Sequence, residues 1–185
     1  MLVLVACVLA LLSPLVAGRW PASLLLNRWK WPLLIWATLI FQTLVLVLPM
    51  PHGLAAVLHV ASYAAAIWFL WLNRHFPGVW FVGAGAFSNG VVIALNGGTL
   101  PASADAVARA GIDHGTEFAN SAVLENPTLL WLGDVFAWPA PLPLANTFSV
   151  GDVLIVVGAV VAAWSGSRRI GARDEAPAEG QTESG

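Results

Sequence analysis

Five apolar runs, each free of charged residues except near its ends, constrain this chain more than any other feature of its sequence. They cover residues 2–17, 32–48, 53–72, 79–95 and 148–164. An α-helix needs about 20 apolar residues to cross the hydrocarbon core of a bilayer, and the runs approach that length. The pattern therefore predicts an all-α, polytopic membrane helical bundle with about five transmembrane helices.

Composition supports a membrane environment and excludes several function classes. The 185 residues are 58% hydrophobic and 10% charged, whereas soluble domains carry about 25% charged residues. A net charge of −2 gives no reason to expect nucleic acid as a partner. The single cysteine, Cys7, excludes an intrachain disulfide and a cysteine metal site, and no cofactor is predicted.

The basic residues predict an orientation in the bacterial cytoplasmic (inner) membrane. Seven of the eight fall on one side of the predicted bundle, namely Arg19, Arg28, Lys30, Arg74, Arg168, Arg169 and Arg173. Cytoplasmic loops carry an excess of lysine and arginine, so this side is predicted to be inside, with the N-terminus out and the C-terminus in. Residues 1–17 are predicted to be a retained span, with a cleaved signal peptide as the alternative.

The predicted domains follow from these spans. Residues 1–166 form a transmembrane helical domain, whose long extracytoplasmic loop, 96–147, includes a short helix at 103–110. Residues 167–185 are a polar tail without aromatic residues, predicted to be disordered and cytoplasmic. Small residues in the fourth span predict close helix packing there, at Gly83, Ala84, Gly85, Ala86 and Gly90.

Polar side chains within the spans predict a pocket that opens to the outer side. Gln42, His59 and Asn89 each lie six residues from the outer end of their span, which corresponds to a depth of about 9 Å. Because polar groups in spans usually face the bundle interior or a cavity, we expect these side chains to converge. The predicted pocket-lining residues are Gln42, His59, Tyr63, Asn89, Asn96, Ser149 and Asp152.

Each of these residues also has a structural interpretation. Ser149 and Asp152 have the spacing of a helix N-cap and its first-turn acid. Hydrogen bonds between helices would account for Gln42, His59, Tyr63 and Asn89, and Asn96-Gly97-Gly98 resembles a helix C-cap and turn. His114 lies near Asp113 and Glu117, but loop residues of this kind usually contact water, and no metal site is predicted.

Two resemblances extend this reading. The motifs Asn96-Gly97-Gly98-Thr99-Leu100-Pro101 and Phe148-Ser149-Val150-Gly151-Asp152 resemble the bacterial membrane family called domain of unknown function 5317, from the second span to the last. That resemblance implies a bacterial, mainly Gram-positive, inner-membrane protein and no established activity.

The second resemblance is local. Phe148-Ser149-Val150-Gly151-Asp152, with Ile155 and Gly158, is similar to the last-helix motif of signal peptidase II, where the aspartate is one of two catalytic carboxylates. Asp134-Val135-Phe136 resembles that family's approach to the motif. Around Ser88-Asn89-Gly90 the match breaks, because Val92 stands where the second aspartate should be. An aspartic dyad needs two carboxylates that share a proton, so Asp134 would have to supply the second.

The leading prediction is a non-enzymatic multi-pass membrane protein with an outward-facing polar pocket around Asp152. Its expected partners are the lipid bilayer, a ligand and a membrane protein of the cell envelope. The alternative is an aspartate-dependent intramembrane hydrolase that uses Asp152 and Asp134. A transporter component ranks third, because the chain shows no internal repeat.

Overall fold

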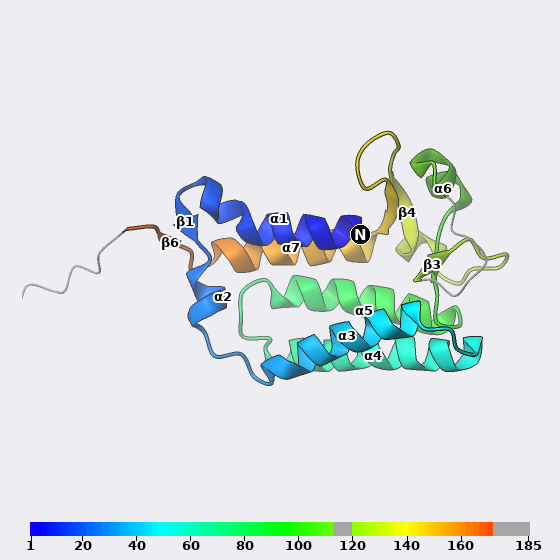
Figure 1. Ribbon diagram of the computed structural model, residues 1–185, viewed down its shortest axis with the longest axis horizontal. Coiled ribbons are helices and arrows are strands. Elements are labelled where there is room, and N and C mark those ends of the chain that lie inside the picture. The colour runs from blue at the N-terminus through cyan, green and yellow to red at the C-terminus, as the bar shows by residue number, and fades with distance from the viewer. Residues whose placement is uncertain (113–119, 172–185) are drawn as a thin grey trace, which may run out of the picture.

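The computed structural model describes residues 1–112 and 120–171. Within these residues the longer helices are α1 (Leu2–Val16), α3 (Pro32–Val47), α4 (His52–Leu72), α5 (Val79–Leu95) and α7 (Val150–Trp164). They lie side by side in the order α1, α7, α5, α4, α3 (Figure 1), and each neighbouring pair in that order is packed together.

Two shorter helices and three two-stranded sheets complete the described fold. The helices are α2 (Ala22–Leu26) and α6 (Ala104–Ala110), and a 3-10 turn, η1, covers Leu130–Leu132. The sheets pair β1 (Arg19–Trp20) antiparallel with β6 (Arg168–Arg169), β2 (Leu100–Pro101) parallel with β3 (Ser121–Ala122), and β4 (Asp134–Trp138) antiparallel with β5 (Asn146–Ser149).

The prediction of an all-α bundle of five transmembrane spans is wrong. The described residues form seven α-helices and three small sheets, and α4 alone is both long and apolar enough to cross a membrane. The other four apolar helices have 15 to 17 residues, because proline, glycine and polar residues end each of them early. The N-out, C-in orientation was inferred from these five spans and loses that basis.

The segment predicted as a long loop, residues 96–147, holds most of the sheet structure. Its backbone N–H and C=O groups need partners when the segment packs against the helices, and short strand pairs supply them. The predicted short helix at 103–110 is present as α6, with Ser103 as its N-cap and Gly111 as its C-cap. Residues 168–169 of the predicted tail form β6, while residues 172–185 lie outside the described part of the chain.

Glycines explain the close contact between α5 and α7. A Cβ atom built on Gly85 would collide with the Gly151 carbonyl oxygen and would lie 2.9 Å from Ile155 Cγ1. A Cβ on Gly158 would lie 2.8 Å from the carbonyl oxygen of Gly78. The small residues predicted to pack closely therefore do so at Gly85, whereas a Cβ on Gly83 would meet nothing within 4 Å.

A fully buried asparagine joins the loop before α3 to the end of α4. Asn73 accepts a hydrogen bond from the backbone N–H of Lys30 at 2.8 Å and donates one to the Lys30 carbonyl at 3.1 Å. Its amide also donates to the Phe69 carbonyl at 2.9 Å. This side chain thus fixes one end of the α3–α4 pair.

Candidate functional site

A closed polar network joins α5 to the start of α7. Asn89 donates from Nδ2 to Asp152 Oδ1 at 3.1 Å and accepts from the Ser149 hydroxyl at 3.0 Å. The Ser149 hydroxyl also accepts from the Asp152 backbone N–H, and the Ser149 N–H donates to Asp152 Oδ2 at 2.9 Å. Ser149 and Asp152 therefore form a capping box, as their spacing indicates, and Asn89 ties it to the neighbouring helix.

The local sequence makes this network possible. Ser149 ends β5 in extended conformation, so its side chain reaches the free N–H groups of the first turn of α7. Gly151 follows because a Cβ atom there would collide with Asn89 Oδ1. Both carboxylate oxygens of Asp152 accept hydrogen bonds within the network. These hydrogen bonds explain the presence of an acid at position 152 without a bound ligand.

Asp134 lies next to the network in the adjacent strand. Its Cα pairs with that of Ser149 in the β4–β5 ladder, and its Oδ2 accepts from the Thr147 hydroxyl at 3.2 Å. The side chain is 4% exposed, and Oδ1 has no hydrogen-bond partner in the described part of the chain. A carboxyl group so placed is costly to ionise.

The electrostatics follow from that position. Burial is the main cause that raises the pKa of Asp134 to about 6, and the negative charge of Asp152 acts in the same direction. The nearby hydroxyls of Ser121 and Thr147 oppose the shift. The structure thus places the two predicted candidate acids, Asp134 and Asp152, close enough to interact electrostatically, although their chain positions differ by 18 residues.

A second polar cluster forms around His59, which is fully buried in α4. Its Nδ1 lies 2.6 Å from the Gly98 carbonyl oxygen, which can only accept, so Nδ1 carries a proton. Its Nε2 lies 3.4 Å from Gln42 Nε2, and its ring meets the Tyr63 ring edge-on at 5.5 Å between centroids. This cluster fixes the turn after α5 onto α4.

The predicted pocket residues are thus distributed over separate sites. Asn89, Ser149 and Asp152 form the capping network, whereas Gln42, His59 and Tyr63 form the cluster on α3 and α4. Asn96 binds Thr128, since Oδ1 accepts from its N–H at 2.8 Å and Nδ2 donates to its carbonyl at 2.9 Å. The acids Asp113 and Glu117 and the histidine His114 lie outside the described residues.

The cavity that Asp152 lines is otherwise apolar. It measures about 450 Å³ and lies between α1, α7 and the β4–β5 hairpin, lined also by Leu2, Leu9, Trp138, Phe148 and Val156. Polar groups therefore do not converge on its interior, and the hydrogen bonds of Asp152 point into the protein instead.

Thr147, which donates a hydrogen bond to Asp134, and Ser121, whose hydroxyl lowers the pKa of Asp134, were not predicted from the sequence. Thr147 had a detectable signal, because alternate residues of a strand share a face and Thr147 and Ser149 are both buried in β5. Ser121 had no such signal, since β3 is only two residues long and pairs with residues of β2 that lie 21 positions earlier.

The comparisons with known proteins agree with the family resemblance. Residues 27–164 match the family described as "Family of unknown function (DUF5317)", which confirms the family of the first resemblance but does not test the membrane location that it implied. An uncharacterized protein of Thermotoga maritima is 31% identical over 97 residues, which span 51% of this chain and 55% of that protein. The match thus covers about half the length of this relative. No solved structure matches the chain.

Proposed function

The chain belongs to the family of unknown function DUF5317, whose description gives no activity, so we propose a function from the geometry. The protein is a non-enzymatic integral membrane protein of the bacterial cytoplasmic membrane. It is anchored by α4, against which α3 and α5 pack, and it holds a ligand or a membrane-protein partner in the membrane.

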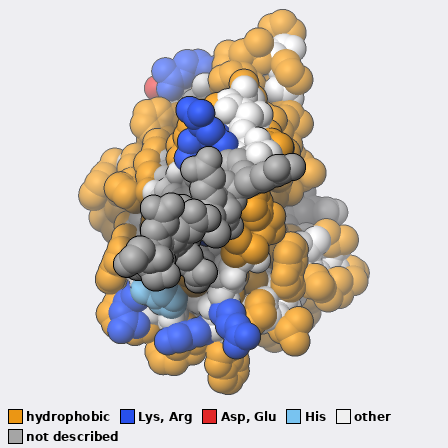
Figure 2. Space-filling model, turned by 90° about the vertical axis from the view of Figure 1, so that its left-hand side faces the viewer, with side chains coloured by type: hydrophobic (Ala, Val, Ile, Leu, Met, Phe, Trp, Pro, Cys, Tyr) orange, Lys and Arg blue, Asp and Glu red, His pale blue; other side chains and the backbone are white. Residues whose placement is uncertain are grey.

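The separation of charge along the molecule carries this proposal. Six basic residues gather at one end, called the basic end here: Arg19, Arg28, Lys30, Arg74, Arg168 and Arg169. Figure 2 looks at this end and shows lysine and arginine side chains spread across it. The acids of the described residues lie toward the opposite end, at Asp105, Glu125, Asp134 and Asp152. A basic end facing the cytoplasm follows the positive-inside rule.

Exposed apolar side chains between the two ends also support a bilayer environment. Leu33 is 79% exposed, Val57 65% and Trp80 61%, on α3, α4 and α5 respectively. Exposure of many large apolar side chains to water is unfavourable, whereas lipid chains accommodate them. With 21 residues, α4 has a length of about 31 Å, enough for the hydrocarbon core.

The hydrogen bonds of Asp152 support a non-catalytic role. A catalytic carboxylate needs an oxygen that reaches substrate or water. Both oxygens of Asp152 accept hydrogen bonds from Asn89 and Ser149, and the cavity beside it is apolar.

Membrane extraction and cysteine labelling test this proposal. In a Cys7→Ala background, the full chain should stay in the membrane pellet after an alkaline carbonate wash. Glu125→Cys should react with an impermeant maleimide in intact cells, and Arg28→Cys only after permeabilisation, since these exposed residues lie at opposite ends. Release of the chain by carbonate, or equal labelling at both positions, would contradict the proposal.

An aspartate-dependent hydrolase is the second candidate, favoured by one observation. The β4–β5 register places Asp134 beside the start of α7, where Asp152 lies, and Asp134 Oδ1 has no partner in the described chain. A two-carboxylate mechanism requires both acids. In cells that lack the protein, Asp134→Asn and Asp152→Asn should then both fail to restore the lost phenotype, while melting temperatures show both variants folded. Restoration by folded Asp134→Asn would exclude the hydrolase.

A further inference from the structure

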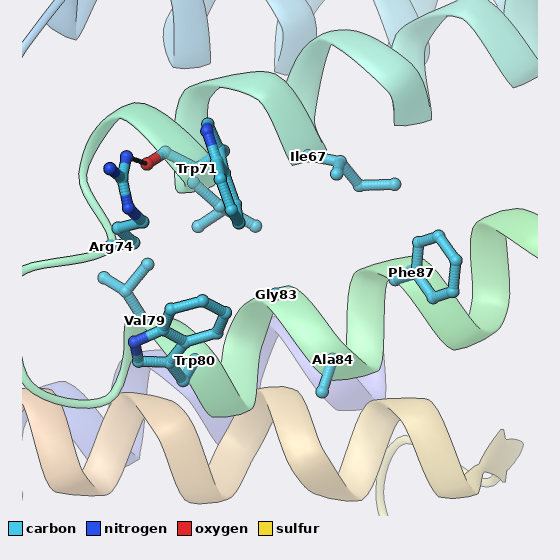
Figure 3. Close-up of a pocket in the computed structure, with 9 residues that line it drawn as sticks. Ile67, Trp71, Arg74, Val79, Trp80, Gly83, Ala84 and Phe87 are labelled. Carbon is cyan, nitrogen blue, oxygen red and sulfur yellow. Dashed lines mark hydrogen bonds between the residues drawn. The ribbon is translucent and has the colours of Figure 1, made fainter.

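A groove runs between α4 and α5 from the basic end toward the middle of the molecule. Figure 3 shows its lining: Ile67 and Trp71 on α4 face Trp80, Gly83 and Phe87 on α5, and Arg74 lies at its end. The groove has a volume of about 260 Å³. From Trp80 to Phe87 it follows about 10 Å of helix, roughly two turns.

We infer that this groove binds one anionic phospholipid, with the lipid phosphate on Arg74 and the first part of an acyl chain between α4 and α5. The inference rests on the proposed membrane location and names the ligand class that this surface would take.

Arg74 has the geometry of a phosphate-binding residue. Its Nη1 donates to the Trp71 carbonyl at 2.9 Å, and its guanidinium carbon lies 4.6 Å from the centre of the Trp71 ring. These contacts orient the planar group at the mouth of the groove and occupy one of its five N–H donors. In the described part of the chain no carboxylate lies at this end to neutralise it.

The two tryptophans fit the boundary between headgroup and acyl chain. Trp71 and Trp80 meet edge-on with 6.0 Å between ring centroids, and they are 50% and 61% exposed. Indole rings favour the interfacial depth of a bilayer, where one side is apolar and the other is wet. Arg74 and the tryptophans therefore match the order of phosphate, glycerol and chain along a lipid.

Gly83 leaves the floor of the groove open. A Cβ atom there would meet nothing within 4 Å, although Gly85, two residues later, is packed against α7. The groove thus exists because one glycine of α5 faces away from the α5–α7 contact. A leucine at Gly83 would fill the groove without a backbone collision.

An anionic lipid fits this surface better than a free phosphate ion or a peptide. Phosphate alone would use Arg74 and leave the apolar lining exposed. Among the described residues the basic end carries arginine and lysine and no carboxylate, which favours an anionic ligand. Basic pockets between membrane helices on the cytoplasmic side are typical sites for anionic lipid headgroups.

Fluorescence quenching by brominated lipids tests the inference with the full chain in nanodiscs. The signal assigned to the groove is the fluorescence of Trp80, obtained by subtracting the emission of Trp80→Phe from that of the wild type. Dibrominated phosphatidylglycerol should quench this signal with a binding constant about fivefold higher than dibrominated phosphatidylcholine, as expected for one arginine at the lipid surface.

Matched variants separate the groove from the general charge of the basic end. Arg74→Gln should abolish the preference for phosphatidylglycerol, whereas Arg28→Gln, at the same end but outside the groove lining, should retain it. Gly83→Leu should remove most of the groove signal for both lipids. Gly53→Leu, where a Cβ would also meet nothing within 4 Å, should not.

Several results would overturn the inference while the proposed function stands. Equal quenching by the two lipids in the wild type, or an equal loss of preference in Arg28→Gln and Arg74→Gln, would show that the groove does not select the headgroup. Competition by millimolar inorganic phosphate would indicate a free-anion site. A co-purified protein that shields Trp80 would indicate a protein partner. A chain that carbonate releases from membranes would instead contradict the proposed function itself.

Discussion

Asp134 and Ser149 lie opposite each other in the β4–β5 ladder, which places a buried carboxyl group beside the residue that caps α7. This relationship joins the sheet region to the helices, because Ser149 also binds Asn89 on α5. The start of α7 is therefore fixed from both sides. The energetic value of this junction can be measured residue by residue.

Asn89→Ala should destabilise the protein by about 2–3 kcal/mol, since it leaves Asp152 Oδ1 and the buried Ser149 hydroxyl each short of a partner. The neighbouring Ser88→Ala is the control. The Ser88 hydroxyl oxygen is buried and makes no hydrogen bond to the described residues, so its loss should cost little. Thermal melts in detergent give the comparison, and equal melting temperatures for the two variants would contradict the bridging role of Asn89.

Gly85→Ala should lower the melting temperature far more than Gly83→Ala. The added methyl at position 85 would collide with the Gly151 carbonyl, and overpacking of this kind costs about 1–3 kcal/mol or more. The methyl at position 83 would enter open space. If both substitutions prove neutral in the same detergent, the helices are not in backbone contact at Gly85.

Asp134→Asn should remove a pH dependence of stability. The pKa of Asp134 is raised in the folded state from 3.8 to about 6. The folded protein therefore holds a proton that the unfolded chain has already released, and stability falls as the pH rises through this window. This difference between the pKa values of the folded and unfolded states, about two units, changes the free energy of unfolding by at most about 3 kcal/mol.

Melts of the wild type and Asp134→Asn between pH 4 and pH 7 measure this effect. Asp134→Asn should not lose stability as the pH rises, and it should be more stable than the wild type at pH 7. Glu125→Gln, at an exposed acid, should behave as the wild type. A decline that persists in Asp134→Asn would assign it to another group.

Asn73→Ala should destabilise the basic end, because Asn73 makes three hydrogen bonds from a fully buried position. Loss of this side chain leaves the Lys30 backbone N–H unpaired, at a cost of about 1–3 kcal/mol. Faster hydrogen exchange at Lys30, measured by mass spectrometry, would report it. Unchanged exchange there, with Asn27→Ala as the control at an exposed position, would count against this role.

The sequence predicted the apolar helices well and the fold class badly. α3 and α5 agree with the predicted runs to within one residue, because proline begins α3 and the small-residue pattern defines α5. Helix length decides the fold class, however, and among the helices of residues 1–112 and 120–171 only α4 is long enough to span a membrane. The strands were missed because they are two to five residues long and depend on pairing with distant segments, as Arg19 does with Arg169.

The candidate site shows the same limit. The capping box of Ser149 and Asp152 was predictable, because its spacing is local. The hydrogen bonds between Asn73 and Lys30 have no local signature, since they depend on how separate elements pack.

The pairing of α1 with α7 has a consequence for the order in which the chain is assembled during synthesis. Trp164 donates from its indole N–H to the Ser13 hydroxyl at 2.8 Å, across 151 positions of sequence, and β1 pairs with β6. Helix α1 is therefore synthesised well before its packing partner α7. Until α7 leaves the ribosome, α1 lacks its main packing partner, so the late closure of this pair should be the step most exposed to misassembly.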